Sequence, residues 1–477
     1  MKKEQYAIKG YFFGKNYRDL GNTIKTSFKG TWHSFIATFA AIGDAWSLDN
    51  VFFAIGLTIF YVILAIARFV FGFLFTILFS IFHIVVVTIV MIFVYLGFVT
   101  VAFIDKIYRT FKKVSNNCPN CQKKYDFPVY HCPNCGAPHR YLYPSSYGIF
   151  THKCTCGTKL PTLLINGRHK LKSTCPHCGN IAIPGVFHST LFPVFGGRSS
   201  GKTCFINGAL TEIEQFAEKS KNLEYSYFYG VAGDERKRFE DYAANGNLPE
   251  STHDNSLVFY NFYLSPKNNF VKNFISLCDI SGEVFQSRQE ITKQVGYRYA
   301  DAVIFVLDPL SIPSFRDELV EAGYDVAKYG GSDHAISDIL SAMLTSLNEI
   351  YRKKNWKLHL VVAFTKSDIP MLDKYIGAKA IKEYRDAHKN CSVIEARDAL
   401  LEKFLIEHDE ANALNMIKNH FVSAHFFPTS AVGKNHKEGT AFEPVGNADP
   451  VLWAIDRPYK NLNFKSYFAE MEGSELC

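Results

Sequence analysis

The hydrophobic residues of this chain gather in one long block near the N-terminus. From Val51 to Ile104 the sequence is almost continuously apolar, interrupted by Arg68 and His83. One transmembrane helix needs about 20 residues, so the block is too long for a single span and long enough for two. The pattern therefore predicts a two-helix transmembrane hairpin over 51–104, in which Arg68 lies near a helix end or faces the partner helix.

The residues on both sides of this block are basic, which predicts its orientation. Residues 1–50 carry many lysines, and four basic residues follow the block between positions 106 and 113. Positive flanks favour the cytoplasmic side, so we expect both ends of a multi-pass anchor there. Within 31–48 the apolar residues have helical spacing, but Asp44 and several polar residues favour an interfacial helix. A third span over these residues is the alternative.

A different pattern begins near residue 186 and continues to residue 477. Short apolar runs typical of strands alternate there with longer stretches of helical periodicity. This alternation predicts an α/β domain over 186–477, with a mostly parallel, Rossmann-like sheet and helices on both faces. The strand candidates are 191–195, 256–264, 274–278, 302–307, 358–364 and 425–428, and the helix candidates include 335–353, 393–406 and 410–419.

Composition and charge narrow the choice of partners more than the choice of fold. The chain has 477 residues, of which 48% are hydrophobic and 20% charged, and its formal net charge is +7. This length is enough for two or three domains with sizeable cores. Most of the positive excess lies beside the apolar block, so we expect membrane lipid as the acidic partner rather than nucleic acid.

Eight of the twelve cysteines lie in close pairs between Cys118 and Cys178. This spacing is typical of metal ligands and favours a reducing compartment. Two pairs complete a tetrahedral Zn²⁺ site and leave no open position for catalysis, so we predict two structural zinc-ribbon modules over 115–183. Pairing neighbours along the chain gives Cys118, Cys121, Cys132 and Cys135 for the first and Cys154, Cys156, Cys175 and Cys178 for the second. We interpret the modules as a rigid spacer; recognition of protein or nucleic acid is the alternative.

The segment Gly196–Thr203 fits the phosphate-binding pattern G-x-x-x-x-G-K-[ST]. Its glycines let backbone N–H groups point inward at phosphates, and the helix that follows adds its positive end. Lys202 would reach the β- and γ-phosphates, and Thr203 would bind Mg²⁺. Arg198 either stabilises transition-state charge or points into solvent. The predicted nucleotide-binding residues here are Gly196, Gly197, Ser199, Ser200, Gly201, Lys202, Thr203 and Cys204.

Two further segments are expected to respond to the γ-phosphate. Asp279–Glu283 has the pattern D-x-x-G at the end of an apolar strand. Asp279 would hold Mg²⁺, and the N–H of Gly282 would sense the γ-phosphate. A second Mg²⁺-binding hydroxyl is expected from the segment 248–252, where Thr252 is favoured over Ser251. An ordinary polar turn is the alternative for that segment.

Two motifs near the C-terminus predict recognition of guanine. Thr365–Asp368 is a variant of N/T-K-x-D, in which the Asp368 carboxylate can accept from guanine N1–H and the exocyclic amine. The Lys366 stem would pack along the base. Within Thr429–Ala431, a backbone N–H of Ser430 or Ala431 can meet guanine O6. Adenine presents no such donors at that edge, so the expected ligands are GTP and GDP with Mg²⁺.

These motifs, in this order, resemble the translation-factor-related class of P-loop GTPases and, more narrowly, the bacterial double-GTPase family. The resemblance covers roughly residues 187 to 460 and extends to Leu307–Pro309 and Asp449–Trp453. It implies a Rossmann-like GTPase that acts as a switch in bacterial signalling or conflict. With the N-terminal block, it implies a protein of the bacterial inner membrane whose zinc modules and GTPase domain face the cytoplasm.

One departure from the family pattern affects the expected chemistry. Small GTPases usually carry glutamine after the D-x-x-G glycine to orient the attacking water, and this chain has Glu283. With Lys202, Glu283 and Arg198 as the candidate catalytic residues, we expect slow GTP hydrolysis, raised by an activating protein or by self-association through the GTPase domain. The alternatives are a non-hydrolysing nucleotide-binding scaffold and an ATPase, and the effector is not identified by the sequence.

Overall fold

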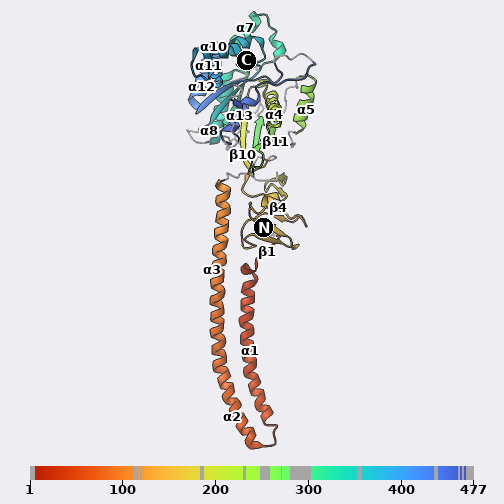
Figure 1. Ribbon diagram of the computed structural model, residues 1–477, viewed down its shortest axis with the longest axis vertical. Coiled ribbons are helices and arrows are strands. Elements are labelled where there is room, and N and C mark those ends of the chain that lie inside the picture. The colour runs from red at the N-terminus through yellow and green to blue at the C-terminus, as the bar shows by residue number, and fades with distance from the viewer. Residues whose placement is uncertain are drawn as a thin grey trace. The chain divides into compact units, whose positions relative to one another are not determined.

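In the computed structural model, the chain forms two compact units. Unit 1 comprises Met1–Lys112, Phe127–Pro176 and Ile181–Pro184, and unit 2 comprises Lys113–Asp126, His177–Asn180 and Gly185–Cys477. The residues that the structure describes are 6–111, 116–118, 121, 123–182, 187–228, 233–247, 258–269, 271–279, 302–331, 334–351, 357–433, 439–459, 462, 464, 467 and 468. Figure 1 labels the elements.

Unit 2 is built on a seven-stranded sheet in the order β11-β12-β13-β10-β14-β15-β16. The strands are β10 (Phe187–Gly196), β11 (Leu223–Tyr227), β12 (Val258–Pro266), β13 (Lys272–Asp279), β14 (Ala302–Leu307), β15 (His359–Phe364) and β16 (Ser423–Pro428). Strands β13, β10, β14, β15 and β16 run parallel, whereas β11 and β12 pair antiparallel at one edge. The predicted α/β class is confirmed, with a sheet that is mixed.

The central strand β14 is apolar along its whole length because both faces of the sheet are covered. All six residues of β14 are buried. On β10, Leu191 and Phe195 join one core and Phe192 and Val194 the other. The proline at position 193 precedes the stretch in which β14 pairs with β10, which begins at Val194.

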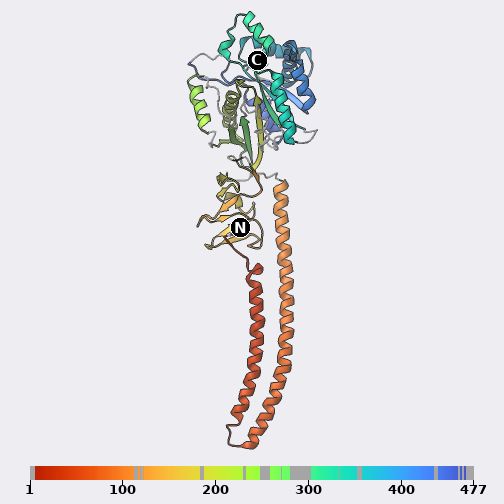
Figure 2. The ribbon, with the colours of Figure 1, turned by 180° about the vertical axis from the view of Figure 1, so that it is seen from behind.

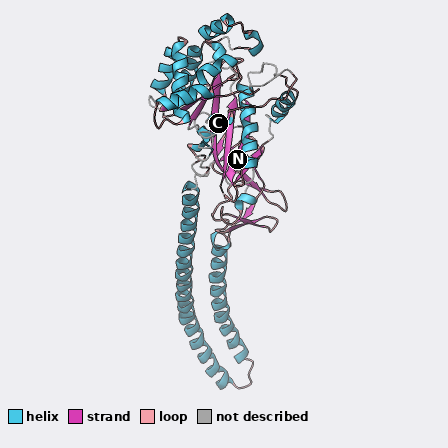
Figure 3. Cartoon of the chain, turned by 45° about the horizontal axis from the view of Figure 1, so that its top comes forward, coloured by secondary structure: helices cyan, strands magenta, loops and turns pink. Residues whose placement is uncertain are grey.

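Helices cover both faces of this sheet, as predicted (Figure 3). On one face lie α7 (Pro313–Glu321), α8 (Ile336–Tyr351), α11 (Val393–Glu407) and α12 (Ala411–His420). On the other lie α4 (Lys202–Lys219) and α13 (Ala448–Asp456). The other α-helices within the described residues of unit 2 are α5 (Gly233–Ala244), α9 (Asp373–Ile376) and α10 (Ala378–Ala387), with short 3-10 turns η6 (Pro309–Ser311), η7 (Val326–Tyr329) and η8 (Pro370–Leu372).

In unit 1 the apolar block forms one continuous helix, so the predicted hairpin within 51–104 is wrong. It consists of α2 (Val51–Ala67), a π-helical turn η2 (Arg68–Gly72) and α3 (Phe73–Phe111). Val51–Phe111 is the one described helix that is long and apolar enough to cross a membrane. The block contains no proline and no polar cluster that would end a helix. The helix is therefore continuous, and its one departure from α-helical geometry is the π-helical turn at Arg68–Gly72.

The partner of this helix is α1 (Lys15–Ala45), which runs antiparallel beside it (Figure 2). Near one end Phe13 contacts Tyr95, and farther along Thr31 and Thr76 share a hydrogen bond of 2.6 Å. Arg68 donates to Thr38 Oγ1 at 2.8 Å. Arg68 therefore does face a partner helix, but that helix is α1, which extends well beyond the interfacial segment predicted over 31–48.

The rest of unit 1 is a small β-rich region that holds both ends of the helical pair. Strand β1 (Ala7–Ile8), which precedes α1, pairs with β6 (Thr151–Cys154), and β6 pairs with β7 (Lys159–Pro161). A second sheet has the order β5 (Pro138–His139), β4 (Val129–His131), β8 (Ser173–Thr174) and β9 (Ile181–Ala182). Near the end of α3, Asp105 forms a buried ion pair with Arg168 at 3.4 Å. In unit 2, β2 (Asn116–Asn117) pairs with β3 (Lys124–Tyr125).

Candidate nucleotide site and metal centres

The phosphate-binding segment connects the end of β10 to the start of α4, as the sequence predicts. A Cβ at Gly196 would come within 2.8 Å of the Val306 carbonyl oxygen and of Ser200 Oγ, so only glycine fits there. Gly201 caps α4 with a φ of 84°, a left-handed conformation that strains other residues. The Ser200 hydroxyl closes the loop by donating to the Gly197 carbonyl at 2.8 Å. These constraints fix the loop at the positive end of α4.

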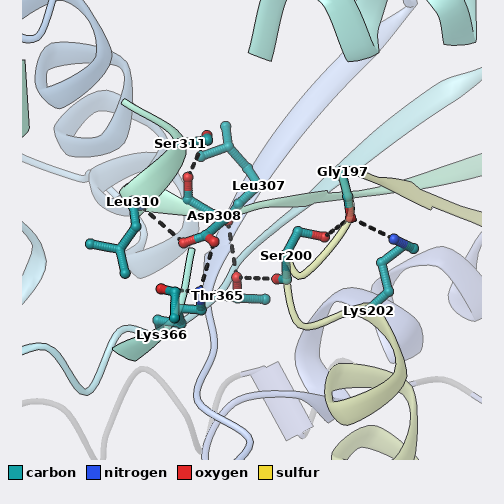
Figure 4. A network of polar contacts seen from close by, with 10 residues as sticks. Gly197, Ser200, Lys202, Leu307, Asp308, Leu310, Ser311, Thr365 and Lys366 are labelled. Atoms are coloured by element: carbon teal, nitrogen blue, oxygen red, sulfur yellow. Dashed lines mark hydrogen bonds and ion pairs between the residues drawn. The ribbon is translucent and has the colours of Figure 1, made fainter. Parts of the chain in front are cut away.

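The three polar side chains expected at the phosphates and Mg²⁺ lie together and are largely buried. Lys202 Nζ donates to the carbonyl oxygen of Gly197 at 2.6 Å (Figure 4). It also donates to the carbonyl oxygen of Gly196 at 3.1 Å. Thr203 Oγ1 donates to Asp279 Oδ2 at 2.8 Å. Burial lowers the pKa of Lys202 and raises the pKa of Asp279, and the attraction between the two charges opposes both shifts. A buried cation beside a hydroxyl–carboxylate pair suits a phosphate with its magnesium ion.

The segment Thr365–Asp368, predicted to recognise guanine, is bonded directly to the phosphate-binding segment (Figure 4). Thr365 Oγ1 donates to the Ser200 carbonyl at 3.0 Å. Lys366 has a φ of 55°, and its Nζ donates to Asp308 Oδ2 at 2.7 Å. The carboxylate of Asp368 accepts from Ser430 Oγ at 2.7 Å, which joins the two motifs predicted to bind guanine. The strand ends of β15 and β16 thus place these residues as expected.

Asp308 is a site residue to which the sequence analysis gave no role. It follows β14, is almost fully buried, and caps η6 by accepting from the backbone N–H of Leu310 at 2.9 Å. Its second oxygen holds Lys366. An aspartate followed by proline after a buried strand is a helix-start signal, and this signal marks the position.

Several predicted site residues lie elsewhere or outside the described part of the chain. Gly282, Glu283 and Thr252 fall outside the described residues, so the expectations for them stay predictions. Arg198 is exposed on its turn. Cys204 is the third residue of α4, and burial raises the pKa of its thiol to about 11. Ala431 follows Ser430 and is partly exposed.

All eight predicted zinc ligands gather in two groups of four, but the predicted pairing is wrong. Cys118 and Cys121 group with Cys175 and Cys178, and Cys132 and Cys135 group with Cys154 and Cys156. Within each group the sulfur atoms lie within 4.8 Å of one another. Four thiolates at about 2.3 Å from a tetrahedral Zn²⁺ would be separated by about 3.8 Å, so both groups fit the ion.

The nested pairing follows from the direction of two strands. β8 runs antiparallel to β4, with Val129 opposite Thr174 and Tyr130 opposite Ser173. The cysteines after β8 therefore lie at the opposite end of the sheet from the cysteines after β4. A glycine with positive φ follows each of the three cysteine turns that end at Cys135, Cys156 and Cys178; these are Gly136, Gly157 and Gly179.

Residues 190–415 match the model of the family Double-GTPase 2. No curated protein matches the chain. Among solved structures, the Ski7 GTPase-like domain of S. cerevisiae bound to GTP is 15% identical, with a TM-score of 0.29, over 58% of this chain and 50% of that chain. Sup35 complexed with GDP is 13% identical, with a TM-score of 0.22, over 52% and 38%.

The chain thus spans half or less of the length of these solved relatives. The match to the family model covers the phosphate-binding segment, Asp279 and Thr365–Asp368, and it ends before Ser430. It confirms the resemblance stated from the motifs. Residues 190–415 of this chain are therefore similar to the Double-GTPase 2 family.

Proposed function

We propose that the protein is a membrane-anchored GTP-binding protein that hydrolyses GTP slowly and acts as a molecular switch. The observation that carries the proposal is the bonded path from phosphate loop to base motif. Thr365 bonds Ser200 of the phosphate loop, and Ser430 orients Asp368 three residues beyond Thr365. A nucleotide that spans this path would place its phosphates at Lys202 and its base at Asp368.

Each described residue has a separate task in this proposal. Lys202 exchanges its two carbonyl partners for phosphate oxygens, which stabilises the charge that builds up during hydrolysis. Thr203 and Asp279 offer the hard oxygen ligands that Mg²⁺ prefers, and the ion would neutralise phosphate charge. Asp368 accepts two hydrogen bonds from guanine, which adenine cannot supply. Slow hydrolysis is expected because the sequence has Glu283 where small GTPases usually carry glutamine, and an activating protein or self-association would raise the rate.

The guanine assignment is tested with the full chain in detergent micelles. We expect tight binding of GTP and GDP and weak binding of ATP, with the preference lost in Asp368→Asn because the amide no longer accepts from both guanine donors. Equal binding of ATP and GTP by the unmodified protein would contradict the proposal. Turnover below about 1 s⁻¹ that disappears in Lys202→Ala would establish hydrolysis, and a complete lack of turnover would favour a binding scaffold.

The membrane part of the proposal rests on the helix Val51–Phe111. Many of its large apolar side chains are exposed, including Phe52 at 89% and Phe71 at 69%. Water would oppose such exposure, whereas lipid would not. We expect the full chain to stay in the membrane pellet after alkaline carbonate extraction and a variant lacking 15–111 to be released. Release of the full chain would contradict membrane anchoring.

A further inference from the structure

A fully buried asparagine behind the base motif is not part of any of the nucleotide-binding motifs. Asn447 immediately precedes α13 and has no exposed surface. Its Nδ2 donates to the Ser430 carbonyl at 2.7 Å. Its Oδ1 is also buried and has no partner among the described residues. A buried amide oxygen without a hydrogen-bond partner costs folding free energy, and the hydrogen bond from Nδ2 to Ser430 is the described contact that offsets part of this cost.

The donor acts on the residue that orients the base-reading carboxylate. Ser430 receives the Asn447 amide on its carbonyl and donates its hydroxyl to Asp368. The same hydroxyl accepts from the backbone N–H of Gly433 at 2.9 Å, so its direction is fixed from both sides. Ser430 and Val445 also form a two-way backbone bridge, at 2.9 and 2.8 Å. The amide of Asn447 therefore positions Ser430, and the Ser430 hydroxyl positions the Asp368 carboxylate.

Helix α4, which begins in the phosphate-binding segment, supports Asn447 from behind. A Cβ at Gly208 would lie 3.1 Å from Asn447 Cγ, so a side chain there would push the amide aside by a few tenths of an ångström. One turn later Glu212 accepts from the backbone N–H of Ala448 at 2.6 Å. The side chain of Asn447 and the backbone of Ala448 thus both contact the helix that carries Lys202.

From this arrangement we propose that Asn447 is a positioning residue for guanine selectivity. It sets the orientation of the Asp368 carboxylate through Ser430, and its own position is set by contact with α4. The inference rests on the proposed function, because it assigns a role within the same nucleotide site. Its consequence concerns base selectivity rather than affinity for phosphate, since Asn447 is bonded to the base loop and not to the phosphate loop.

The test compares three nucleoside diphosphates on the full chain in micelles. GDP and IDP differ by the exocyclic amine that Asp368 reads, and ADP reports on phosphate binding. In Asn447→Leu, which keeps size and removes the amide, we expect the GDP-over-IDP preference to fall at least about tenfold while ADP affinity stays within about twofold. Asn261→Leu is the matched control: Asn261 is a buried asparagine of β12 bonded to Ser276 at 2.6 Å, and it should keep the preference.

A second variant keeps the inference testable if Asn447→Leu does not fold. Gly208→Ala adds one methyl group that suits a helix but presses on the amide, and the preference should fall about threefold or more. An unchanged GDP-over-IDP ratio in a folded variant would overturn the role of Asn447 while leaving the proposed function intact. No preference for GDP in the unmodified protein would instead overturn the proposed function, and the inference with it.

Discussion

At the scale of single residues, the nucleotide site depends on close contacts that leave no room for change. Gly196 lies against the next strand, and Lys202 is buried among carbonyl groups of its own loop. Both positions were predictable because the motif encodes a local backbone shape. Asn447 was not predictable, since its task depends on a helix more than 200 residues earlier in the chain, and no local pattern records that contact.

The first prediction concerns Gly196→Ala. The added methyl group would meet the Val306 carbonyl at 2.8 Å, so β10 or β14 must shift. We expect the free energy of unfolding to fall by about 1–3 kcal/mol and GDP binding to weaken at least about tenfold. Urea unfolding and nucleotide titration measure the two effects. Gly30→Ala, where a Cβ meets nothing within 4 Å, is the control and should lose neither.

The second prediction concerns the pH dependence that Glu212 introduces. Burial raises the pKa of its carboxyl to about 7, so the folded protein favours the neutral acid more than the unfolded chain does. This contribution is fully present below about pH 4.5 and is lost as pH rises through 7, a difference of about 3 kcal/mol at most. Relative to Glu212→Gln, the unmodified protein should therefore lose unfolding free energy between pH 5 and 8. A constant difference across that range would contradict the assignment.

At the scale of elements, strand direction decided a question that cysteine spacing left open. Each close pair of cysteines is local and was recognised from the sequence. The choice of partner turn depends on the antiparallel pairing of β4 and β8, whose three and two residues are too short to give a periodic signal. The hairpin predicted within 51–104 was wrong for a related reason. Composition gives the length of an apolar block but does not show where a helix ends and the chain reverses direction.

The third prediction separates nested from sequential zinc sites. Each site needs four thiolates, so losing one ligand should empty that site. The double variant Cys118→Ser with Cys175→Ser removes two ligands of one observed group, and we expect one zinc ion per chain by elemental analysis. Cys118→Ser with Cys132→Ser damages both groups and should lose both ions. The reverse result would restore the sequential pairing.

At the scale of the whole molecule, the β-rich part of unit 1, which contains one of the two cysteine groups, fixes both ends of the helical pair. β1 enters its sheet before α1 begins, and Asp105 of α3 reaches into its core. Arg168 completes this contact by donating to the carbonyl oxygens of Leu142 and Thr162 as well. Such long-range ties are invisible in a sequence read segment by segment.

The fourth prediction tests that tie with Asp105→Ala. The change leaves the Arg168 guanidinium, which is only 1% exposed, without its carboxylate, and this should cost about 3–5 kcal/mol locally. Hydrogen exchange should accelerate in peptides that contain β6 and β7. Peptides from β14, in unit 2, serve as the internal reference and should not change. Unaltered protection of β6 would show that the ion pair does not stabilise this region.

The nested ligand groups also impose an order on biosynthesis. The inner group consists of Cys132, Cys135, Cys154 and Cys156, and the outer group of Cys118, Cys121, Cys175 and Cys178. The inner group has been synthesised completely once the ribosome passes Cys156, whereas the outer group is complete only after Cys178. Metal capture by the inner group shortens the loop that the outer group must close and so lowers its entropic cost. We expect assembly to proceed outward from the inner ion, and a chain that ends shortly after Cys156 should already bind one zinc. The nucleotide-binding sequence follows both groups, so it would emerge last, behind a metal-bound segment that is already folded.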